Sequence, residues 1–212
     1  MSVERLRVVV IIGSIRRGRF GPTAAGWFAA HASERDDVEV DVVDLAEAWL
    51  PEVLPDVRAR LPTPQPVRDL APWLAAADAF VVVTPEYNHG FPGALKNAID
   101  WFREEWRAKP VAFVCYGGPA GGLRAVEQLR LVFTAVGAVP IRETVSLRDH
   151  RDRFDSAGRP LDRGTTNAAA TALLGQLTWW AALLRDNRAG PPPDTRCDVP
   201  PDNHPLPRGP HR

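Results

Sequence analysis

The sequence predicts an α/β fold in which helices cover both faces of a parallel sheet. Two observations lead to this prediction: short apolar runs alternate with longer amphipathic stretches, and glycine-bearing loops join them. The apolar runs are rich in β-branched residues, which is typical of strands buried on both faces. We therefore expect a three-layer sandwich with a five-stranded parallel sheet, built from one domain over residues 1–188.

Each element has its own signal. Strands are expected at residues 6–12, 38–43, 79–84, 111–116 and 138–142, with residue 147 as an alternative end of the last one. Helices are expected after Pro22 and at residues 67–77, 94–103, 123–136 and 165–185. In the last helix Leu173, Leu177, Trp180 and Leu184 recur at intervals of three and four residues, which predicts one buried face.

The segment 189–212 has a different composition from the rest of the chain. From Pro191 onward it holds eight prolines in twenty-two residues and almost no large apolar side chains. Such a segment cannot bury enough surface to fold by itself. We expect a disordered or polyproline-like tail, or an arm packed on a partner subunit. A third alternative is a polyproline ligand, which would suit a non-catalytic scaffold protein.

Charge and cysteine content restrict the partners and the compartment. Twenty-six basic and twenty-six acidic residues give a net charge of zero, so nothing favours binding to nucleic acid or to an anionic membrane. No apolar stretch approaches the roughly 20 residues of a membrane span. Cys115 lies in a predicted strand and Cys197 in the tail, a pattern that favours a reducing compartment over a disulfide framework. A cytoplasmic protein is expected.

The loop at residues 13–21 joins the first strand to the first helix, where backbone N–H groups and the helix dipole favour an anion. Ser14, Arg16 and Arg19 add hydrogen-bond donors. The loop lacks the Lys and Ser or Thr of a Walker A sequence, and its glycines do not fit the dinucleotide fingerprint. A phosphomonoester is therefore the expected ligand.

A second loop follows the third strand and contains Pro85, Glu86, Tyr87 and Asn88. Backbone donors and the Asn88 amide can face the edge of a heterocycle, and Tyr87 offers a ring for stacking. Gly117 and Gly118 follow the fourth strand. Because the carboxyl ends of parallel strands meet at one sheet edge, these three loops are expected to surround a single crevice.

At these residues the chain resembles the NADPH-dependent FMN reductase family, flavodoxin-like quinone, azo-dye and chromate reductases. The resemblance spans roughly residues 8–136, and its most specific part runs from Pro85 to Trp101. It implies FMN as cofactor, without a metal. The phosphate contacts implied are Ser14, Arg16, Gly18, Arg19, Phe20 and Gly21; the ring and ribityl contacts are Pro85, Glu86, Tyr87, Asn88, Gly117 and Gly118. Many members carry Ser in place of Arg19 and Asn in place of Gly21, so these two roles stay open.

The resemblance also implies an activity. It indicates transfer of two electrons from NADPH or NADH through FMN to a quinone, a flavin or a similar small acceptor, with no essential acid or base residue. Lys96, Asn97 and Asp100 would serve the helix and subunit contacts of a homodimer or homotetramer. Two alternatives remain: a flavodoxin-like electron carrier, although such carriers are strongly acidic and this chain is neutral, and a protein that supplies reduced flavin to a monooxygenase.

Overall fold

The computed structural model describes residues 5–55 and 61–188 of the chain. The predicted proline-rich tail at residues 189–212, with Cys197 in it, lies outside the described residues. Within the described part, no helix is both long and apolar enough to cross a bilayer.

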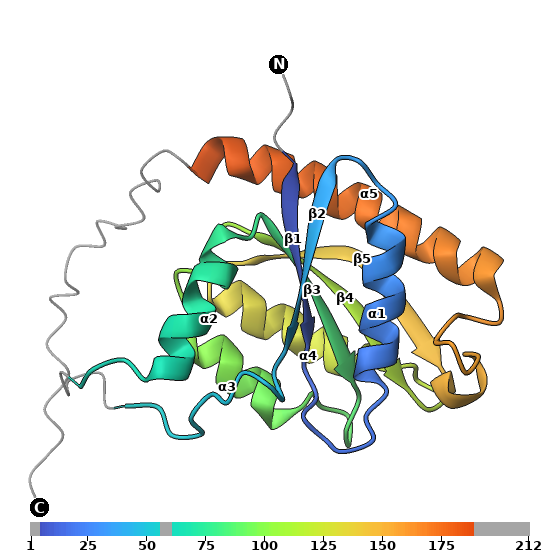
Figure 1. The fold of residues 1–212 in the computed structure, drawn as a ribbon, viewed down its shortest axis with the longest axis horizontal. Coiled ribbons are helices and arrows are strands. Elements are labelled where there is room, and N and C mark those ends of the chain that lie inside the picture. Colours follow the sequence, from blue (N-terminus) through green and yellow to red (C-terminus); the bar gives the residue numbers. More distant parts are fainter. Residues whose placement is uncertain (1–4, 56–60, 189–212) are drawn as a thin grey trace, which may run out of the picture.

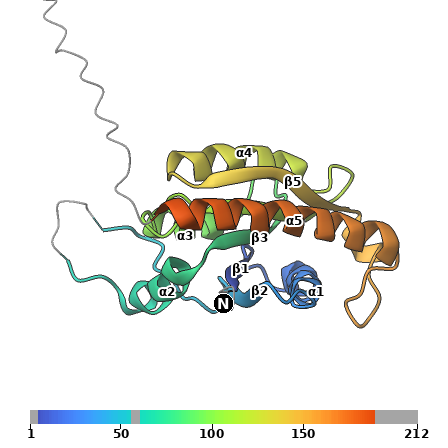
Figure 2. The same cartoon turned by 90° about the horizontal axis from the view of Figure 1, so that it is seen from above.

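The described residues form one parallel sheet between two layers of helices (Figures 1 and 2), as predicted. The strands lie in the order β2-β1-β3-β4-β5. Their bounds are β1 (Leu6–Ile12), β2 (Val38–Asp44), β3 (Ala79–Pro85), β4 (Pro110–Gly117) and β5 (Val139–Arg148). The helices are α1 (Gly21–Ala32), α2 (Gln65–Ala76), α3 (Gly93–Trp101), α4 (Leu123–Ala135) and α5 (Arg163–Arg188), with a short 3-10 helix, η1, at His150–Asp152.

The core consists of two apolar layers, one on each face of the sheet. Val8 and Val10 of β1 face α1 and α5, whereas Val9 and Ile11 face α2, α3 and α4. All four side chains are buried. This alternation explains why the run of β-branched residues at β1 is continuous: each residue meets one of two helical layers.

Several element boundaries differ from the sequence prediction by a few residues, and two of them have a clear physical reason. The last strand continues without a break from Val139 to Arg148, and an irregularity in its pairing with β4 between Val111 and Phe113 accommodates the change in register. Helix α5 begins at Arg163, because the side chain of Asp162 accepts a hydrogen bond from the Thr165 N–H at 3.1 Å and so caps the first turn.

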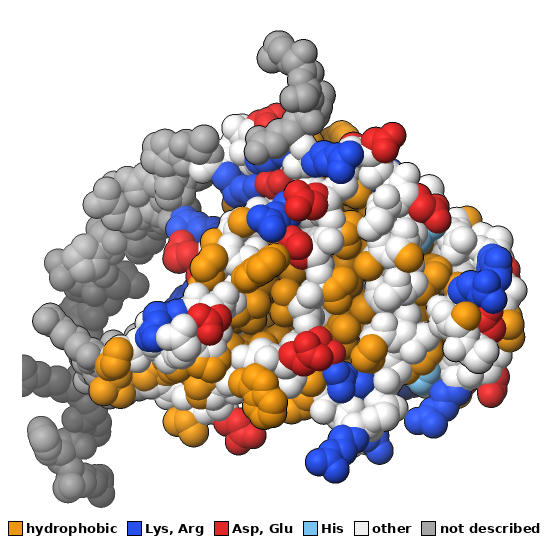
Figure 3. All heavy atoms as spheres, viewed as in Figure 1, with side chains coloured by type: hydrophobic (Ala, Val, Ile, Leu, Met, Phe, Trp, Pro, Cys, Tyr) orange, Lys and Arg blue, Asp and Glu red, His pale blue; other side chains and the backbone are white. Residues whose placement is uncertain are grey.

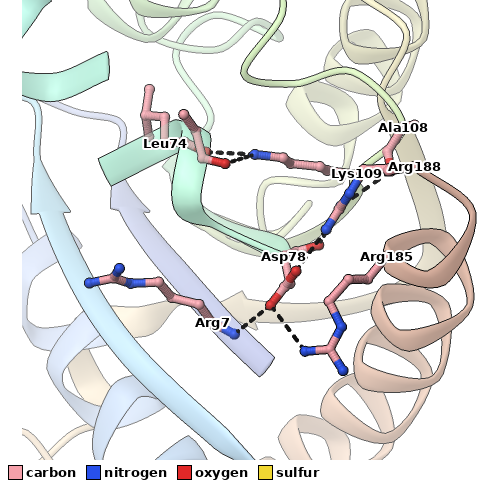
Figure 4. A network of polar contacts seen from close by, with 8 residues as sticks. Arg7, Leu74, Asp78, Ala108, Lys109, Arg185 and Arg188 are labelled. Atoms are coloured by element: carbon pink, nitrogen blue, oxygen red, sulfur yellow. Dashed lines mark hydrogen bonds and ion pairs between the residues drawn. The ribbon is translucent and has the colours of Figure 1, made fainter. Parts of the chain in front are cut away.

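A charged network holds the amino-terminal edge of the sheet to the helices (Figure 4). The carboxylate of Asp78 accepts hydrogen bonds from the Arg7 N–H at 3.0 Å and from the guanidinium of Arg188 at 2.7 Å, and it lies 3.7 Å from Arg185. Beside it, the buried amine of Lys109 donates to the carbonyls of Leu74 and Ala75, at 2.8 and 2.7 Å, near the carboxyl end of α2. Polar side chains thus satisfy the last carbonyls of α2.

The buried amine makes stability depend on pH. Burial, helped by the nearby positive charge of Arg188, lowers the pKa of Lys109 from 10.5 to about 8. Between these two values the unfolded chain holds a proton that the folded chain has lost, so stability rises with pH. We therefore compare the free energy of unfolding of the wild type with that of Lys109→Met at pH values equal to these two pKa values. The difference should increase by about 2 kcal/mol from the lower pH to the higher pH. Urea unfolding at both pH values measures this difference, and parallel pH profiles would contradict it.

Candidate cofactor site

The first loop, residues 13–20 between β1 and α1, is joined to the loop after β3 by one hydrogen bond. The hydroxyl of Ser14 is fully buried and lies 2.7 Å from the hydroxyl of Tyr87. The Arg16 N–H donates to the same Ser14 oxygen at 3.4 Å, and the Arg16 guanidinium lies 5.9 Å from the centre of the Tyr87 ring. Ser14, Arg16 and Tyr87, which the sequence placed in one crevice, are therefore brought together.

The guanidinium of Arg19 turns toward the neighbouring strand. One of its terminal nitrogens pairs with the carboxylate of Asp44 at the end of β2. Its Nε is buried and has no hydrogen-bond partner within the described residues. Because a buried donor is rarely left without an acceptor, this nitrogen is a candidate contact for an anion held by the loop.

The glycines of the first loop have two different roles. Gly18 adopts a left-handed conformation with a φ of 65°, and a Cβ there would meet no atom within 4 Å. Gly21 is the reverse: a Cβ would lie 2.8 Å from Ile12 and 3.2 Å from the Tyr116 hydroxyl. Open space therefore remains beside Gly18, whereas Gly21 is required for α1 to pack closely on β1 and β4. The side chain of Phe20 packs inward, with its ring centre 5.3 Å from that of Tyr116.

The second loop is rigid. Pro85 ends β3, the Glu86 N–H donates to the carbonyl of Tyr116 at 3.0 Å, and Tyr87 and Gly90 exchange two backbone hydrogen bonds. Between them Asn88 has a φ of 50° and His89 a φ of 68°, which is left-handed backbone that non-glycine residues seldom adopt. Strained backbone of this kind is typical of ligand-binding positions.

The carboxylate of Glu86 is already engaged. It accepts hydrogen bonds from the backbone N–H of Arg124, at 3.2 Å, and from its guanidinium, at 2.8 Å. Arg124 lies in the first turn of α4, so this ion pair fixes the second loop to the helix that follows β4. The Glu86 side chain therefore positions the loop, and a contact between Glu86 and FMN stays a prediction.

The third loop follows β4. A Cβ on Gly118 would meet no atom within 4 Å, so space is open beside it. The carbonyl of Gly117 accepts hydrogen bonds from the Asp149 N–H at 3.0 Å and from Nδ1 of His150 at 3.3 Å. The segment after β5 thus supports a loop that the sequence assigned to the crevice.

His150 is a residue that the sequence prediction missed. Its ring centre lies 4.5 Å from that of Phe20 and 5.0 Å from that of Tyr116, so it contacts the first loop and the end of β4 together. Burial lowers the pKa of His150 below 6.5, and the ring is neutral at neutral pH with Nδ1 donating to Gly117. Because His150 follows the last strand in an arginine-rich turn, no sequence motif distinguishes it.

The Tyr116 hydroxyl is also buried without a hydrogen-bond partner in the described structure. Burial raises its pKa, an effect that the nearby Gly21 N–H only partly opposes. The phenol therefore stays protonated, and it is a second unsatisfied polar atom between the first and third loops.

Lys96, Asn97 and Asp100, expected to serve the helix, all have contacts of that kind within the chain. Lys96 pairs with Asp100 at 2.5 Å, four residues on. The Asn97 amide and the Trp101 indole both donate to the carbonyl of Pro51, at 2.9 and 2.8 Å. These bonds fasten the loop after β2 onto α3. Their part in subunit contacts stays a prediction.

The groups that the three loops present suit a phosphate with a flat heterocycle attached. Three features of the first loop suit an anion: the buried Arg19 Nε without a partner, the basic side chain of Arg16 and the open space beside Gly18. Two features of the other loops suit the edge of a ring: the left-handed turn at Asn88 and the open space beside Gly118. No cluster of three His, Cys, Asp or Glu side chains suited to a metal ion occurs in residues 5–55 and 61–188.

Comparisons with known proteins identify the fold and the family of this chain. The fold is the flavodoxin-like α/β sandwich, and among solved structures it is similar to a flavoenzyme NAD(P)H:(acceptor) oxidoreductase from Paracoccus denitrificans, with a TM-score of 0.66 and 25% identity over 85% of this chain and 98% of that chain. Residues 6–152 match the family model for NADPH-dependent FMN reductase. This chain belongs to the NADPH-dependent FMN reductase family.

Two relatives illustrate the range of the family. A quinone reductase of Escherichia coli strain K12 is 32% identical over 189 residues, which cover 86% of this chain and 97% of the relative. An NAD(P)H-dependent FMN reductase of Schizosaccharomyces pombe is 36% identical over 121 residues, which cover 55% of this chain and 60% of that relative. The likeness to the first relative thus extends over nearly the whole of both chains.

The support that His150 gives to the loops predicts an effect on cofactor affinity. Replacing His150 by Ala removes two ring contacts and one hydrogen bond, so we expect the FMN dissociation constant to rise about tenfold. His150→Phe keeps the ring packing and should have a smaller effect, and Arg151→Ala, an exposed neighbour, is the control. Quenching of FMN fluorescence on titration with apoprotein measures all three; equal affinity for His150→Ala and wild type contradicts the assignment.

The loop after β4 allows a matched pair of glycine variants. Gly122 has a φ of 89°, and a Cβ there would lie 2.8 Å from both the Tyr116 nitrogen and the Cys115 Cβ. Gly122→Ala should therefore lower the free energy of unfolding of the apoprotein by roughly 1–3 kcal/mol. Gly118→Ala adds a Cβ in open space and should leave it nearly unchanged. Equal urea midpoints for the two variants would show that the close approach at Gly122 is unimportant.

Proposed function

We propose that this protein is an FMN-dependent NAD(P)H oxidoreductase that reduces a quinone or a similar small acceptor. The observation that supports this best is the convergence of three loops, after β1, β3 and β4, on one crevice, with the Ser14–Tyr87 hydrogen bond joining the first two. Family membership and the likeness to a quinone reductase over nearly its whole length support the same activity.

In this proposal the first loop holds the FMN phosphate. Ser14, Arg16 and the unpaired Nε of Arg19 supply donors, with the backbone of Gly18, Phe20 and Gly21 around them. The Arg19–Asp44 ion pair keeps the guanidinium oriented and prevents it from reaching freely into solvent. These residues bind and orient; none of them has to gain or lose a proton.

The second and third loops hold the ring system. When bound, FMN supplies the redox chemistry, taking two electrons from a nicotinamide coenzyme and giving them to the acceptor. Pro85, Tyr87 and Asn88 provide a rigid wall, and Gly117 and Gly118 provide a backbone edge with space beside it. Backbone N–H groups near the ring stabilise negative charge without reorganising, which is the effect expected of preorganised donors.

Assembly and location belong to the proposal as well. We propose a homodimer or homotetramer, a state supported by large apolar side chains such as Leu131 of α4, which is 75% exposed. Static light scattering measures this state directly. A cytoplasmic location is supported by the free, buried thiol of Cys115.

The activity test uses the full chain reconstituted with excess FMN. It should oxidise NADPH or NADH and reduce a benzoquinone with matching stoichiometry, which the loss of nicotinamide absorbance measures.

Ser14→Ala breaks the bond to Tyr87 and should weaken FMN binding by about tenfold, while activity of the FMN-saturated fraction changes less. A protein that binds FMN but does not oxidise the coenzyme would be an electron carrier; one that binds no FMN would refute the proposal.

A further inference from the structure

A groove between β2, the loop after it and α2 carries two exposed tryptophans. It has a volume of about 350 Å³, and its lining includes Val42, Trp49, Leu70 and Trp73. Trp49 is 79% exposed and Trp73 49% exposed, and hydrophobic side chains gather over this part of the molecule in Figure 3. Trp49 also has a φ of 50°, a conformation that a bulky residue adopts only under constraint. Exposing a polar side chain to water at this position would cost less free energy than exposing an indole. The exposed indole therefore indicates a binding surface.

The rim of this groove is acidic. Glu47 and Asp69 line it, and neither carboxylate forms an ion pair with another residue of the described structure; Asp69 accepts one hydrogen bond, from the Gln65 amide at 2.5 Å. Asp44 also lines the groove but is paired with Arg19. An occupant that combines apolar rings with positive charge would match both the tryptophans and the carboxylates of Glu47 and Asp69, which lack a cationic partner in the described residues.

The chain leaves the described structure near this groove. The guanidinium of Arg188, the last residue of α5, bonds to Asp78, and the same carboxylate accepts the Arg7 N–H (Figure 4). The Arg7 guanidinium in turn lies 5.5 Å from the centre of the Trp73 ring. Figures 1 and 2 both place the last turn of α5 toward the end of the molecule that holds α2. The last described turn of α5 therefore lies within a few side-chain lengths of Trp73.

The segment 204–212, His-Pro-Leu-Pro-Arg-Gly-Pro-His-Arg, has the chemistry that the groove requires. It contains three prolines, two arginines and no acidic residue. Prolines lack the N–H that pairing with the edge strand β2 would need, but they favour the polyproline II conformation, which docks in aromatic-lined grooves. The fifteen residues 189–203 can extend to roughly 45 Å in that conformation, more than the length of α5, so the span is sufficient.

We propose that residues 204–212 dock in this groove of the same chain, with their prolines against Trp49 and Trp73 and with Arg208 and Arg212 facing Glu47 and Asp69. The tail then covers the exposed indoles without an added domain. Tethering supplies an effective concentration of about 1 mM, so a contact with a dissociation constant of about 1 mM is populated about half of the time.

The chain offers a selective label for the test. Cys115 is fully buried, and burial raises the pKa of its thiol to about 12, so a nitroxide reagent reacts with Cys197 alone. In the FMN-loaded, isotope-labelled full chain, indole N–H signals are assigned by single Trp→Phe substitutions. Trp179 is the control, because it is 57% exposed on α5, only ten residues before the tail begins.

A docked tail should attenuate the signals of Trp49 and Trp73 about twofold more than that of Trp179. Arg208→Glu with Arg212→Glu should abolish the difference, because like charges then face the rim. Attenuation that is equal at all three indoles, or largest at Trp179, means a free tail and overturns the proposal. If Trp49 and Trp73 are still attenuated more than Trp179 in the Arg208→Glu, Arg212→Glu chain, the proposed pairing of these arginines with Glu47 and Asp69 is overturned.

A mixed sample decides whether the tail binds its own chain. Spin-labelled chain without isotope is combined with isotope-labelled Cys197→Ser chain, so that any attenuation arises between molecules. No attenuation is expected at Trp49 or Trp73. Attenuation of Trp49 and Trp73 in the mixed sample would show an arm laid on a second copy and would overturn docking within one chain; neither outcome depends on the reductase activity.

Discussion

The site depends on the adjacency of three parallel strands. Because β1, β3 and β4 are neighbours in the sheet and point the same way, the loops that follow them must emerge at one edge. The hydrogen bond between the buried Ser14 hydroxyl and Tyr87 fastens two of these loops directly. Each loop alone is a turn with a few donors; together, at one edge of the sheet, they present the groups that we propose hold the phosphate and the ring of FMN.

The loops are supported from behind by residues that do not face the crevice. Arg124 holds Glu86 from the start of α4, and His150 holds Gly117 while its ring packs on Phe20 and Tyr116. Since the redox chemistry belongs to the cofactor, the protein contributes mainly by fixing where donors lie. Rigid support of this kind matters more here than any single titratable side chain.

The opposite edge of the sheet has a separate function. There Asp78 joins β1 to the end of α5, and Lys109 satisfies the final carbonyls of α2. Burying a charge costs free energy unless every partner is present. Burial therefore disfavours the charged form of the Lys109 amine and lowers its pKa. The polar groups at the amino edge of the strands are thus structural, whereas the carboxyl edge combines structural ion pairs, such as Arg19–Asp44 and Arg124–Glu86, with the groups proposed to bind FMN.

The sequence by itself determined the five strands, their parallel direction and the loops of the crevice, because β-branched runs, glycine turns and helical periodicity are local signals. It also indicated that Cys115 lies in a strand and that Ser14, Tyr87 and Gly117 lie at one edge of the sheet. Only the tertiary structure decided what depends on distant partners: the Arg19–Asp44 pair, the contacts of His150 and the exposure of Trp49. Those features join residues far apart in the chain, and no spacing within a segment encodes which side chain will meet which across the sheet edge.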